Sequence, residues 1–186
     1  MTFNIIGTGN TAWFIATRLV AGGHICNGVY GRNMEATQKL ANSTASKAFE
    51  LASGINDTAD VCIIAISDHA IDDIVKNLSF RGTVLLHTAG AVDADVLVAA
   101  AQHYGVIWPI YSIVKDNLPV EKTIPTAWEA STETARQTIL TLLPALTDMA
   151  YEADSTQRRW LHMNAVFSNN FTNHIFAIVQ HLCAEK

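Results

Sequence analysis

The first twelve residues constrain the fold of this chain more than any other stretch. An apolar run at residues 3–6 leads into Gly7-Thr8-Gly9-Asn10-Thr11-Ala12, and an amphipathic helical pattern follows. Dinucleotide-binding βαβ units have this order of strand, glycine turn and helix N-terminus. Gly7 permits the tight turn. Gly9 lets a pyrophosphate approach free N–H groups at the positive end of the helix dipole. The alternative is a tight strand–helix turn that binds no ligand.

A second signal follows the next predicted strand, residues 25–30, where the sequence continues Gly31-Arg32-Asn33. Folds that bind NAD usually place a carboxylate here, about 20 residues after the glycines. Arg32 stands here instead, and a guanidinium can pair with a 2′-phosphate. We therefore expect NADP as the cofactor, and the alternative is a solvated arginine on a turn. The expected cofactor-binding residues of these two stretches are Gly7, Thr8, Gly9, Asn10, Thr11, Arg32 and Asn33.

Strand and helix patterns alternate along the rest of the chain. Further strands are expected at residues 48–51, 61–66, 83–87, 106–110, 126–129 and 149–152. Helices are expected at residues 34–43, 93–103 and 132–146, with another opened by residues 67–69. This alternation predicts an α/β fold with a doubly wound, mainly parallel, Rossmann-like sheet. Ligands of such sheets bind beyond the carboxyl ends of the strands, which here carry Thr8, Arg32, Ser67, Asp68, His87, Thr88, Pro109 and Ser112.

The last thirty residues differ from the rest. Residues 155–184 contain no Gly or Pro and predict one long helix with two apolar stripes at helical spacing. Packing one side on a Rossmann-like domain cannot bury both stripes. We therefore expect an NADP-binding domain at residues 1–153 and the start of a helical dimerisation or substrate domain at 154–186. The chain is then a homodimer through this helix, either as a fragment of a longer parent or as a natural short form.

Composition limits the partners. The formal net charge is −5 with no basic run, which argues against nucleic acid. The 49% hydrophobic content against 16% charged residues predicts apolar surface that meets a partner. Three widely spaced cysteines indicate a reducing, cytoplasmic location and neither a disulfide framework nor a metal site. No signal peptide or membrane span is expected.

Six stretches together resemble the pyrroline-5-carboxylate reductase-like and deazaflavin-dependent NADP oxidoreductase-like proteins. The resemblance is strongest to a branch in which a helical domain of unknown function follows a Rossmann-like domain. The stretches are residues 7–12, 31–33, 65–71, 87–91 (HTAGA), 108–110 and 162–171 (HMNAVFSNNF). The chain departs from the branch at Ala89, where serine is usual, and at Trp108, where histidine is usual. Members of the branch also continue beyond this C-terminus with further helices.

The resemblance implies a nicotinamide end lined by Ser67, Asp68, His87 and Thr88. A proton donor at His87 or His162 would suit reduction of an imine or carbonyl. Asp68 has an equal alternative as only the N-cap of the following helix. His87 has an alternative as a neutral side chain hydrogen-bonded within its loop.

Expected substrate-binding residues are Ser112, at a strand end, and Asn169 and Asn170, which lie in the helix segment 162–171 that carries the resemblance. Buried polar groups need partners, so the alternative for the asparagines is a polar ladder that fixes the register of a helix–helix dimer.

The predicted function is that of an NADP-dependent oxidoreductase that transfers a hydride to or from a small carbonyl or imine compound. A flavin or deazaflavin is an alternative hydride partner. A non-catalytic dinucleotide sensor or scaffold is the alternative from another class, and a fold that binds a different adenosine cofactor is a third.

Overall fold

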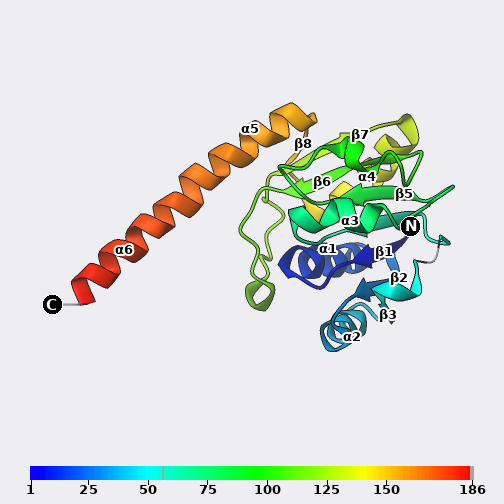
Figure 1. Cartoon of the computed structure of the whole chain (residues 1–186), viewed down its shortest axis with the longest axis horizontal. Coiled ribbons are helices and arrows are strands. Elements are labelled where there is room, and N and C mark those ends of the chain that lie inside the picture. Colours follow the sequence, from blue (N-terminus) through cyan, green and yellow to red (C-terminus); the bar gives the residue numbers. More distant parts are fainter. Residues whose placement is uncertain (56, 185–186) are drawn as a thin grey trace.

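The computed structural model describes residues 1–55 and 57–184. One eight-stranded sheet forms the centre of the molecule, in the order β3-β2-β1-β4-β5-β6-β7-β8 (Figure 1). The strands are β1 (Thr2–Ile6), β2 (Ile25–Gly31), β3 (Lys47–Glu50), β4 (Val61–Ile64), β5 (Val84–His87), β6 (Tyr104–Pro109), β7 (Thr126–Ala130) and β8 (Ala150–Glu152). The predicted α/β class and mainly parallel sheet are confirmed.

Strand pairing creates a switch point at β1. The chain passes from β1 to β2 and β3 on one side of β1, then crosses back so that β4 pairs with the other side of β1, and β1 is parallel to both β2 and β4. In open α/β sheets a crevice opens at such a point, outside the carboxyl ends of the strands. Only the β6–β7 pairing is antiparallel among the described strand pairs. The sequence therefore places its glycine turn at the one edge where helices diverge.

Helices cover both faces of the sheet. The helices are α1 (Asn10–Ala21), α2 (Met34–Ser43), α3 (Ile71–Val75), α4 (Glu133–Leu146), α5 (Ser155–Ala165) and α6 (Thr172–Ala184). One core cluster joins Phe3 and Ile5 of β1 to the apolar sides of α1, α2 and α4. A second cluster joins Ile6 of β1 and Ile64 of β4 to α3 on the opposite face. The alternation of side chains along β1 thus supplies both layers.

Local capping fixes where the helices begin. Asn33 and Thr132 each accept a hydrogen bond from the third residue of the helix that follows. Asp154 forms a reciprocal capping box with Gln157, in which each side chain accepts from the other residue's backbone N–H. These caps explain why α2, α4 and α5 begin within two residues of the positions expected from sequence.

The helix expected at residues 93–103 is wrong for most of its length. Only Ala94–Leu97 winds, as a 3-10 turn. The carbonyl of Ala100 accepts from Phe80 N–H, and the carbonyl of His103 accepts from Leu85 N–H, so both are used by neighbouring segments. The backbone here forms hydrogen bonds to neighbouring segments instead of bonds within a helix, and apolar periodicity alone does not predict this.

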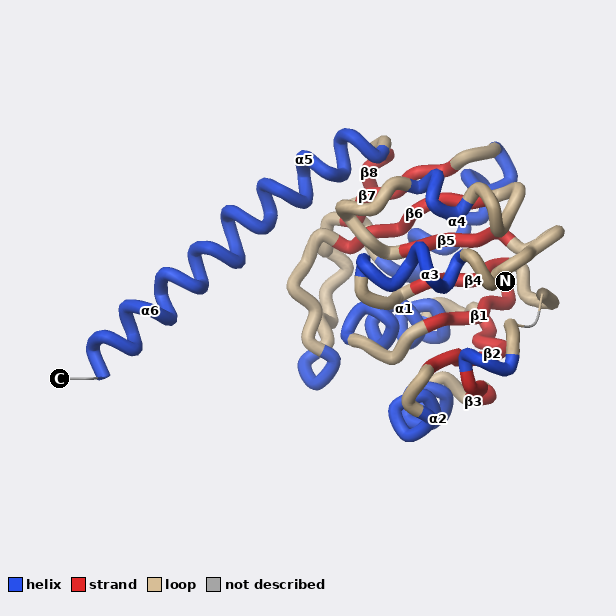
Figure 2. Tube along the Cα trace, in the orientation of Figure 1, coloured by secondary structure: helices blue, strands red, loops and turns tan. Residues whose placement is uncertain are grey.

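The long C-terminal helix is confirmed and leaves the sheet as a projecting arm (Figure 1; Figure 2). Its middle part, residues 166–171, winds as a π-helix between α5 and α6. One predicted stripe contains Trp160, Ile175 and Ile178, and the other contains Met163, Phe176 and Val179. Side chains of both stripes are exposed, with Trp160 at 61% and Phe176 at 68% of full exposure. In the described part of the chain, no helix has both the length and the apolar character needed to span a bilayer.

Candidate functional site

The first cavity, cavity 1, opens at the switch point and measures about 590 Å³. It lies where β1, β2 and β4 end and where α1 and α2 begin. The structure brings together here all seven residues expected to bind the cofactor from the two N-terminal stretches, and adds Ser67. The lining includes Gly7, Thr8, Gly9, Asn10, Thr11, Arg32, Asn33 and Ser67.

The glycine loop has the backbone geometry of a phosphate cradle. Gly7 has a φ of +120°, a conformation that L side chains rarely adopt. A Cβ atom there would lie 2.1 Å from the Ala65 carbonyl oxygen, while the Gly7 N–H donates to the Tyr30 carbonyl over 2.8 Å. A Cβ at Gly9 would project into open space. The first N–H groups of α1 face the same edge, so the loop fits a pyrophosphate at the positive end of the helix dipole.

Arg32 and Asn33 mark the end of this cavity beside β2. Arg32 is exposed, and among the described residues no carboxylate pairs with it. Asp73, which also lines the cavity, pairs with Lys76 at 3.1 Å. Asn33 accepts from Ala36 N–H as the N-cap of α2, so its side chain is already engaged. Arg32 is therefore the group available to a 2′-phosphate.

Two residues expected at the nicotinamide end do not line the nucleotide-binding cavity. Asp68 and Thr88, both in the described part of the chain, lie outside the lining of cavity 1. Asp68 begins a 3-10 turn after Ser67 and is exposed. The Thr88 hydroxyl is buried and donates to the Ile64 carbonyl over 3.4 Å. The structure thus favours a local structural role for Thr88. The alternative of Asp68 as a helix N-cap is wrong, because Ser67 precedes the 3-10 turn, Ala70 precedes α3, and neither position has a side-chain cap.

His87 lies at the end of β5 with no exposed surface. Its Nδ1 accepts from Ala89 N–H over 3.1 Å, and its Nε2 is 3.3 Å from the Asp93 carbonyl oxygen, so Nε2 carries the hydrogen. Burial, aided by the charge of Arg158, lowers the pKa of His87 to about 4. A neutral imidazole with both nitrogens engaged is the structural alternative that the sequence left open, and the structure favours it over a proton donor.

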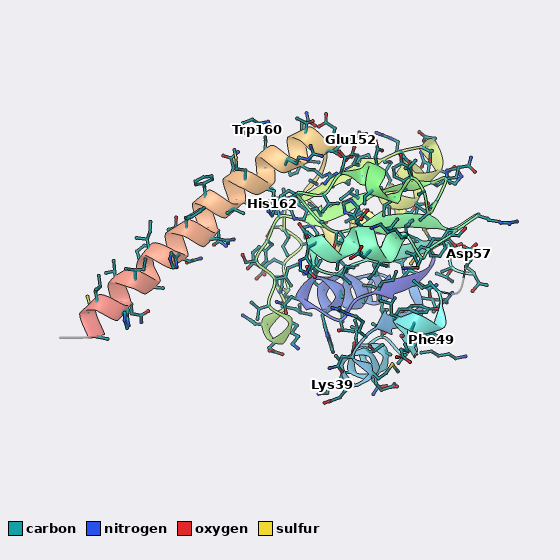
Figure 3. The ribbon with its side chains drawn as sticks, in the orientation of Figure 1. Lys39, Phe49, Asp57, Glu152, Trp160 and His162 are labelled. Atoms are coloured by element: carbon teal, nitrogen blue, oxygen red, sulfur yellow. The ribbon has the colours of Figure 1, made fainter. Side chains whose placement is uncertain are left out.

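The second cavity, cavity 2, lies between the loop after β6 and the long helix and measures about 520 Å³. It gathers His162 from α5 together with Ser112, Asn169 and Asn170. Figure 3 shows His162 on the side of α5 that faces the sheet domain. The His162 ring packs against Trp108 with centroids 5.6 Å apart. Four residues that sequence analysis placed in proton transfer and substrate binding thus share one cavity.

The π-helical turn shapes this second cavity. Asn169 donates to the Ser112 hydroxyl over 2.7 Å and accepts from Asn173 over 3.0 Å. The turn at residues 166–171 supplies most of the helix side of the cavity. Single π turns within α-helices occur frequently at functional sites, because they redirect side chains that a regular helix would point elsewhere.

One loop connects the two cavities. The backbone N–H of Lys115 donates to the Asn10 side chain of the glycine loop over 3.2 Å. Three residues earlier, Ser112 holds the Asn169 amide. Arg18 of α1 ties the far end of this loop down by donating to the Pro119 carbonyl over 2.6 Å. The loop therefore joins the nucleotide-binding edge to the long helix.

Sequence analysis missed Arg158. It is the largest side chain among those that are fully buried, and it lies in the first turn of α5. Its guanidinium contacts Glu129 on β7 and the turn that follows β5. An arginine two residues before Trp160 on an amphipathic helix reads as a solvated charge, so no local pattern identifies it.

Comparison with known families matches two parts of the chain. Residues 2–91 match the family described as NADP oxidoreductase coenzyme F420-dependent. Residues 124–186 match the domain of unknown function DUF2520. The first match contains the glycine loop, Arg32 and β5, and the second contains β7 and the long helix. A search of curated proteins found no match.

Solved structures that are similar to the chain include the following three. A "putative NADP oxidoreductase" from Bacteroides fragilis is 31% identical, with a TM-score of 0.87, 99% of this chain covered and 72% of that one. A reductive aminase from Aspergillus terreus in complex with NADPH and ethyl-5-oxohexanoate is 19% identical, with a TM-score of 0.70 and coverage of 98% and 65%. A pyrroline-5-carboxylate reductase from Coxiella burnetii is 20% identical, with a TM-score of 0.65 and coverage of 98% and 70%. The last two establish the fold alone.

The cofactor assignment and the family now rest on independent findings. Cavity 1 has a cradle for a pyrophosphate and an available guanidinium, and the matched family uses NADP. The resemblance between the chain and the Bacteroides protein extends over both parts, sheet and helix. This chain belongs to the NADP-dependent oxidoreductase family in which a Rossmann-like nucleotide-binding domain is joined to DUF2520.

Proposed function

We propose that the protein reduces a small imine or carbonyl compound, with NADPH in cavity 1 and the substrate in cavity 2. The observation that carries this proposal is the convergence of His162, Ser112 and Asn169 around one cavity, which the loop after β6 joins to the nucleotide-binding edge. The names of two solved relatives, a reductive aminase and a pyrroline-5-carboxylate reductase, support an imine or carbonyl as the reacting group.

His162 is the proton donor in this proposal. NADPH, when bound, supplies the hydride. Addition of a hydride to the carbon of a C=N or C=O bond leaves negative charge on the nitrogen or oxygen, which must receive a proton. His162 is half-buried and lines cavity 2, whereas His87 is buried and fully engaged. A histidine side chain can hold and deliver that proton as a general acid.

Polar side chains of cavity 2 orient the substrate. Ser112 accepts a hydrogen bond from Asn169 and retains its own hydroxyl hydrogen to donate. Asn170 lines the same cavity. Trp108 supplies the apolar wall, which excludes water from the reacting carbon. Ser67, on cavity 1, is the residue of the predicted nicotinamide end that we propose to contact the cofactor.

Turnover with a matched histidine pair tests this function. The full chain is assayed for NADPH consumption with 2-methyl-1-pyrroline and with small cyclic ketones. Exchange of His162 for Gln should lower kcat about 100-fold, the usual range for loss of a general acid. Exchange of His174 for Gln, an exposed histidine further along the same arm, should leave kcat unchanged. Equal rates in both variants, or no turnover of any compound by the wild type, would contradict the proposal.

We also infer a homodimer through the long helix. None of the described residues of α6 is buried in the single chain, although both apolar stripes run along it. Contiguous apolar surface of this kind marks an interaction site.

We place the domain boundary between residues 153 and 154, because β8 ends at Glu152 and α5 begins at Ser155. The three free cysteines support a cytoplasmic location.

A further inference from the structure

Arg158 is a fully buried, hydrogen-bonded side chain that no functional assignment uses. Its side chain is 0% exposed, yet it carries a full positive charge in the first turn of α5. Burying such a charge is costly unless it is paired and hydrogen-bonded on all sides. The contacts around this guanidinium therefore show what its burial accomplishes.

One side of the guanidinium holds the turn that follows β5. The Arg158 Nη1 group donates to the carbonyl oxygens of Ala89, Gly90 and Val92, at 3.1, 3.2 and 3.0 Å. Three carbonyls of one turn thus converge on one nitrogen. A lysine ammonium could not reproduce this planar fork while also reaching a second partner.

The other side of the guanidinium reaches β7 and its own helix. Nε and Nη2 donate to the same Glu129 carboxylate oxygen, at 3.2 and 2.7 Å. Nη2 also donates to the Ser155 hydroxyl at 3.0 Å, and that hydroxyl donates to Glu129 at 2.9 Å. Both ends of the fork are therefore fixed, and the first turn of α5 cannot rotate about the helix axis without breaking them.

His162 follows Arg158 by four residues, one turn along the same face of α5. The rotation that buries Arg158 is consequently the rotation that points His162 at Trp108 and into cavity 2. Beyond this point the arm has little other anchoring, since none of the described α6 residues is buried and Asn169 makes one hydrogen bond to Ser112.

We propose that Arg158 is a positioning residue that fixes the rotation of α5 and thereby sets the His162 ring over Trp108 in cavity 2. Its partners are the carbonyls of the turn after β5 and the carboxylate of Glu129. The functional meaning of that placement rests on the proposed role of His162 in proton delivery, but the placement itself does not.

The test compares Arg158→Lys with Arg159→Lys in the full-length chain. Arg159 is the matched control, because it is the next residue, is half-exposed, and forms a surface ion pair with Asp93. The readout is the proton chemical shift of the His162 ring in ¹³C-labelled protein at low temperature, which the Trp108 ring current displaces. Tm, the NADPH Kd and kcat are measured on the same samples.

Arg158→Lys should move the His162 resonance toward its value in Trp108→Ala and lower kcat at least tenfold, with the NADPH Kd changed less than twofold. Arg159→Lys should leave the resonance and kcat as in the wild type. A lower Tm with an unmoved His162 resonance in the folded protein would overturn the proposal, because a purely stabilising arginine predicts that result.

Should Arg158→Lys fail to fold, Glu129→Gln gives a milder test. It removes the charge of the partner and retains the arginine with its three carbonyls. The His162 resonance should then move partway in the same direction, and an unmoved resonance would overturn the proposal. These results are separable from the proposed function, because unchanged turnover in His162→Gln would refute proton delivery and leave the Arg158 placement standing.

Discussion

The nucleotide-binding edge and the projecting helix each contribute a cavity, but they are built in different ways. At the edge, buried strands fix the backbone, and the backbone makes the site: Gly7 has no room for a side chain, and the N–H groups of α1 point outward. On the helix, side chains make the site. Arg158 is the single buried residue among the described residues of α5, and it sets the direction in which those side chains point. The helix surface otherwise faces solvent (Figure 3).

Because the two sites are built differently, substitutions should impair stability, binding and assembly differently in the two regions. A site made by backbone fails when the chain cannot adopt the conformation, so stability and binding fall together. A site made by side chains on an exposed helix can lose its geometry or its partner while the sheet domain stays folded. Substitutions in the two regions should therefore produce distinct combinations of stability, assembly and binding.

The largest effect should come from Gly7→Ala. The new Cβ would lie 2.1 Å from the Ala65 carbonyl oxygen at a φ of +120°, so strain and overlap should cost about 3 kcal/mol or more of folding free energy. Urea unfolding measures the loss.

Gly9→Ala is the matched comparison, since its Cβ meets open space. It should change stability by less than about 0.5 kcal/mol. Its NADPH affinity should still fall about tenfold, equal to about 1.4 kcal/mol. Equal stability losses would contradict the backbone account.

The next effect concerns assembly. The double variant Ile175→Glu/Ile178→Glu places two charges on an apolar stripe that is exposed in the single chain. Each lost isoleucine removes about 1.5–3 kcal/mol of burial from a dimer interface, so sedimentation analysis should show monomers where the wild type forms dimers. Gln180→Glu, a polar position on the same helix, should leave the dimer intact. A monomeric wild type, or a dimer that survives the double exchange, would refute the interface.

Cofactor choice should respond to Arg32→Ala. A charge-assisted hydrogen bond contributes about 1.5–3 kcal/mol, so NADPH affinity should fall about 10- to 100-fold. NADH affinity should change less than about twofold, because NADH lacks the 2′-phosphate. Titrations followed by nucleotide fluorescence measure both. Equal losses for the two nucleotides would show that Arg32 does not contact that phosphate.

The smallest effect should be a change in pH dependence. Burial is the main cause that lowers the pKa of His87 to about 4, so the unfolded chain binds an extra proton as the pH falls below 6.5, the ordinary pKa of histidine. The stability that His87 supplies is complete above pH 6.5 and is lost as pH falls toward 4. Between pH 7.5 and 5.5 the loss should be about 1 kcal/mol. In His87→Gln this share of the pH dependence should disappear from urea unfolding curves. An unchanged dependence would indicate a solvated imidazole.

The two regions also differ in how far sequence could predict them. The strand, glycine turn and helix at residues 3–12 have a local signature, and Arg32 follows a strand at a fixed distance, so cavity 1 was predictable as a unit. His162, Ser112, Asn169 and Asn170 were named from strand ends and from resemblance, yet their convergence depends on a loop that crosses from β6 to the helix. That connection has no short-range pattern.

The structure of several residues could not be predicted from the sequence, because it depends on tertiary contacts. Apart from Ser155, the hydrogen-bond partners of Arg158 lie 29 to 69 residues away in the sequence, and no periodicity encodes such contacts. Residues 93–103 have helical apolar spacing, but their carbonyls pair with β5 and with Phe80, and this tertiary pairing outweighs the local preference. Asp68 and Thr88 follow strands as a cofactor site requires, yet both lie outside the lining of cavity 1, and only the tertiary structure shows this.

The most direct test of the two-cavity account is a magnetisation-transfer experiment on the full chain with bound NADP⁺. The nicotinamide C4 hydrogen is saturated, and transfer to assigned side-chain protons is recorded. The account predicts transfer to Trp108 and His162, because hydride transfer requires the nicotinamide to meet a substrate in cavity 2. Transfer confined to residues of cavity 1, with none to Trp108 or His162, would contradict it.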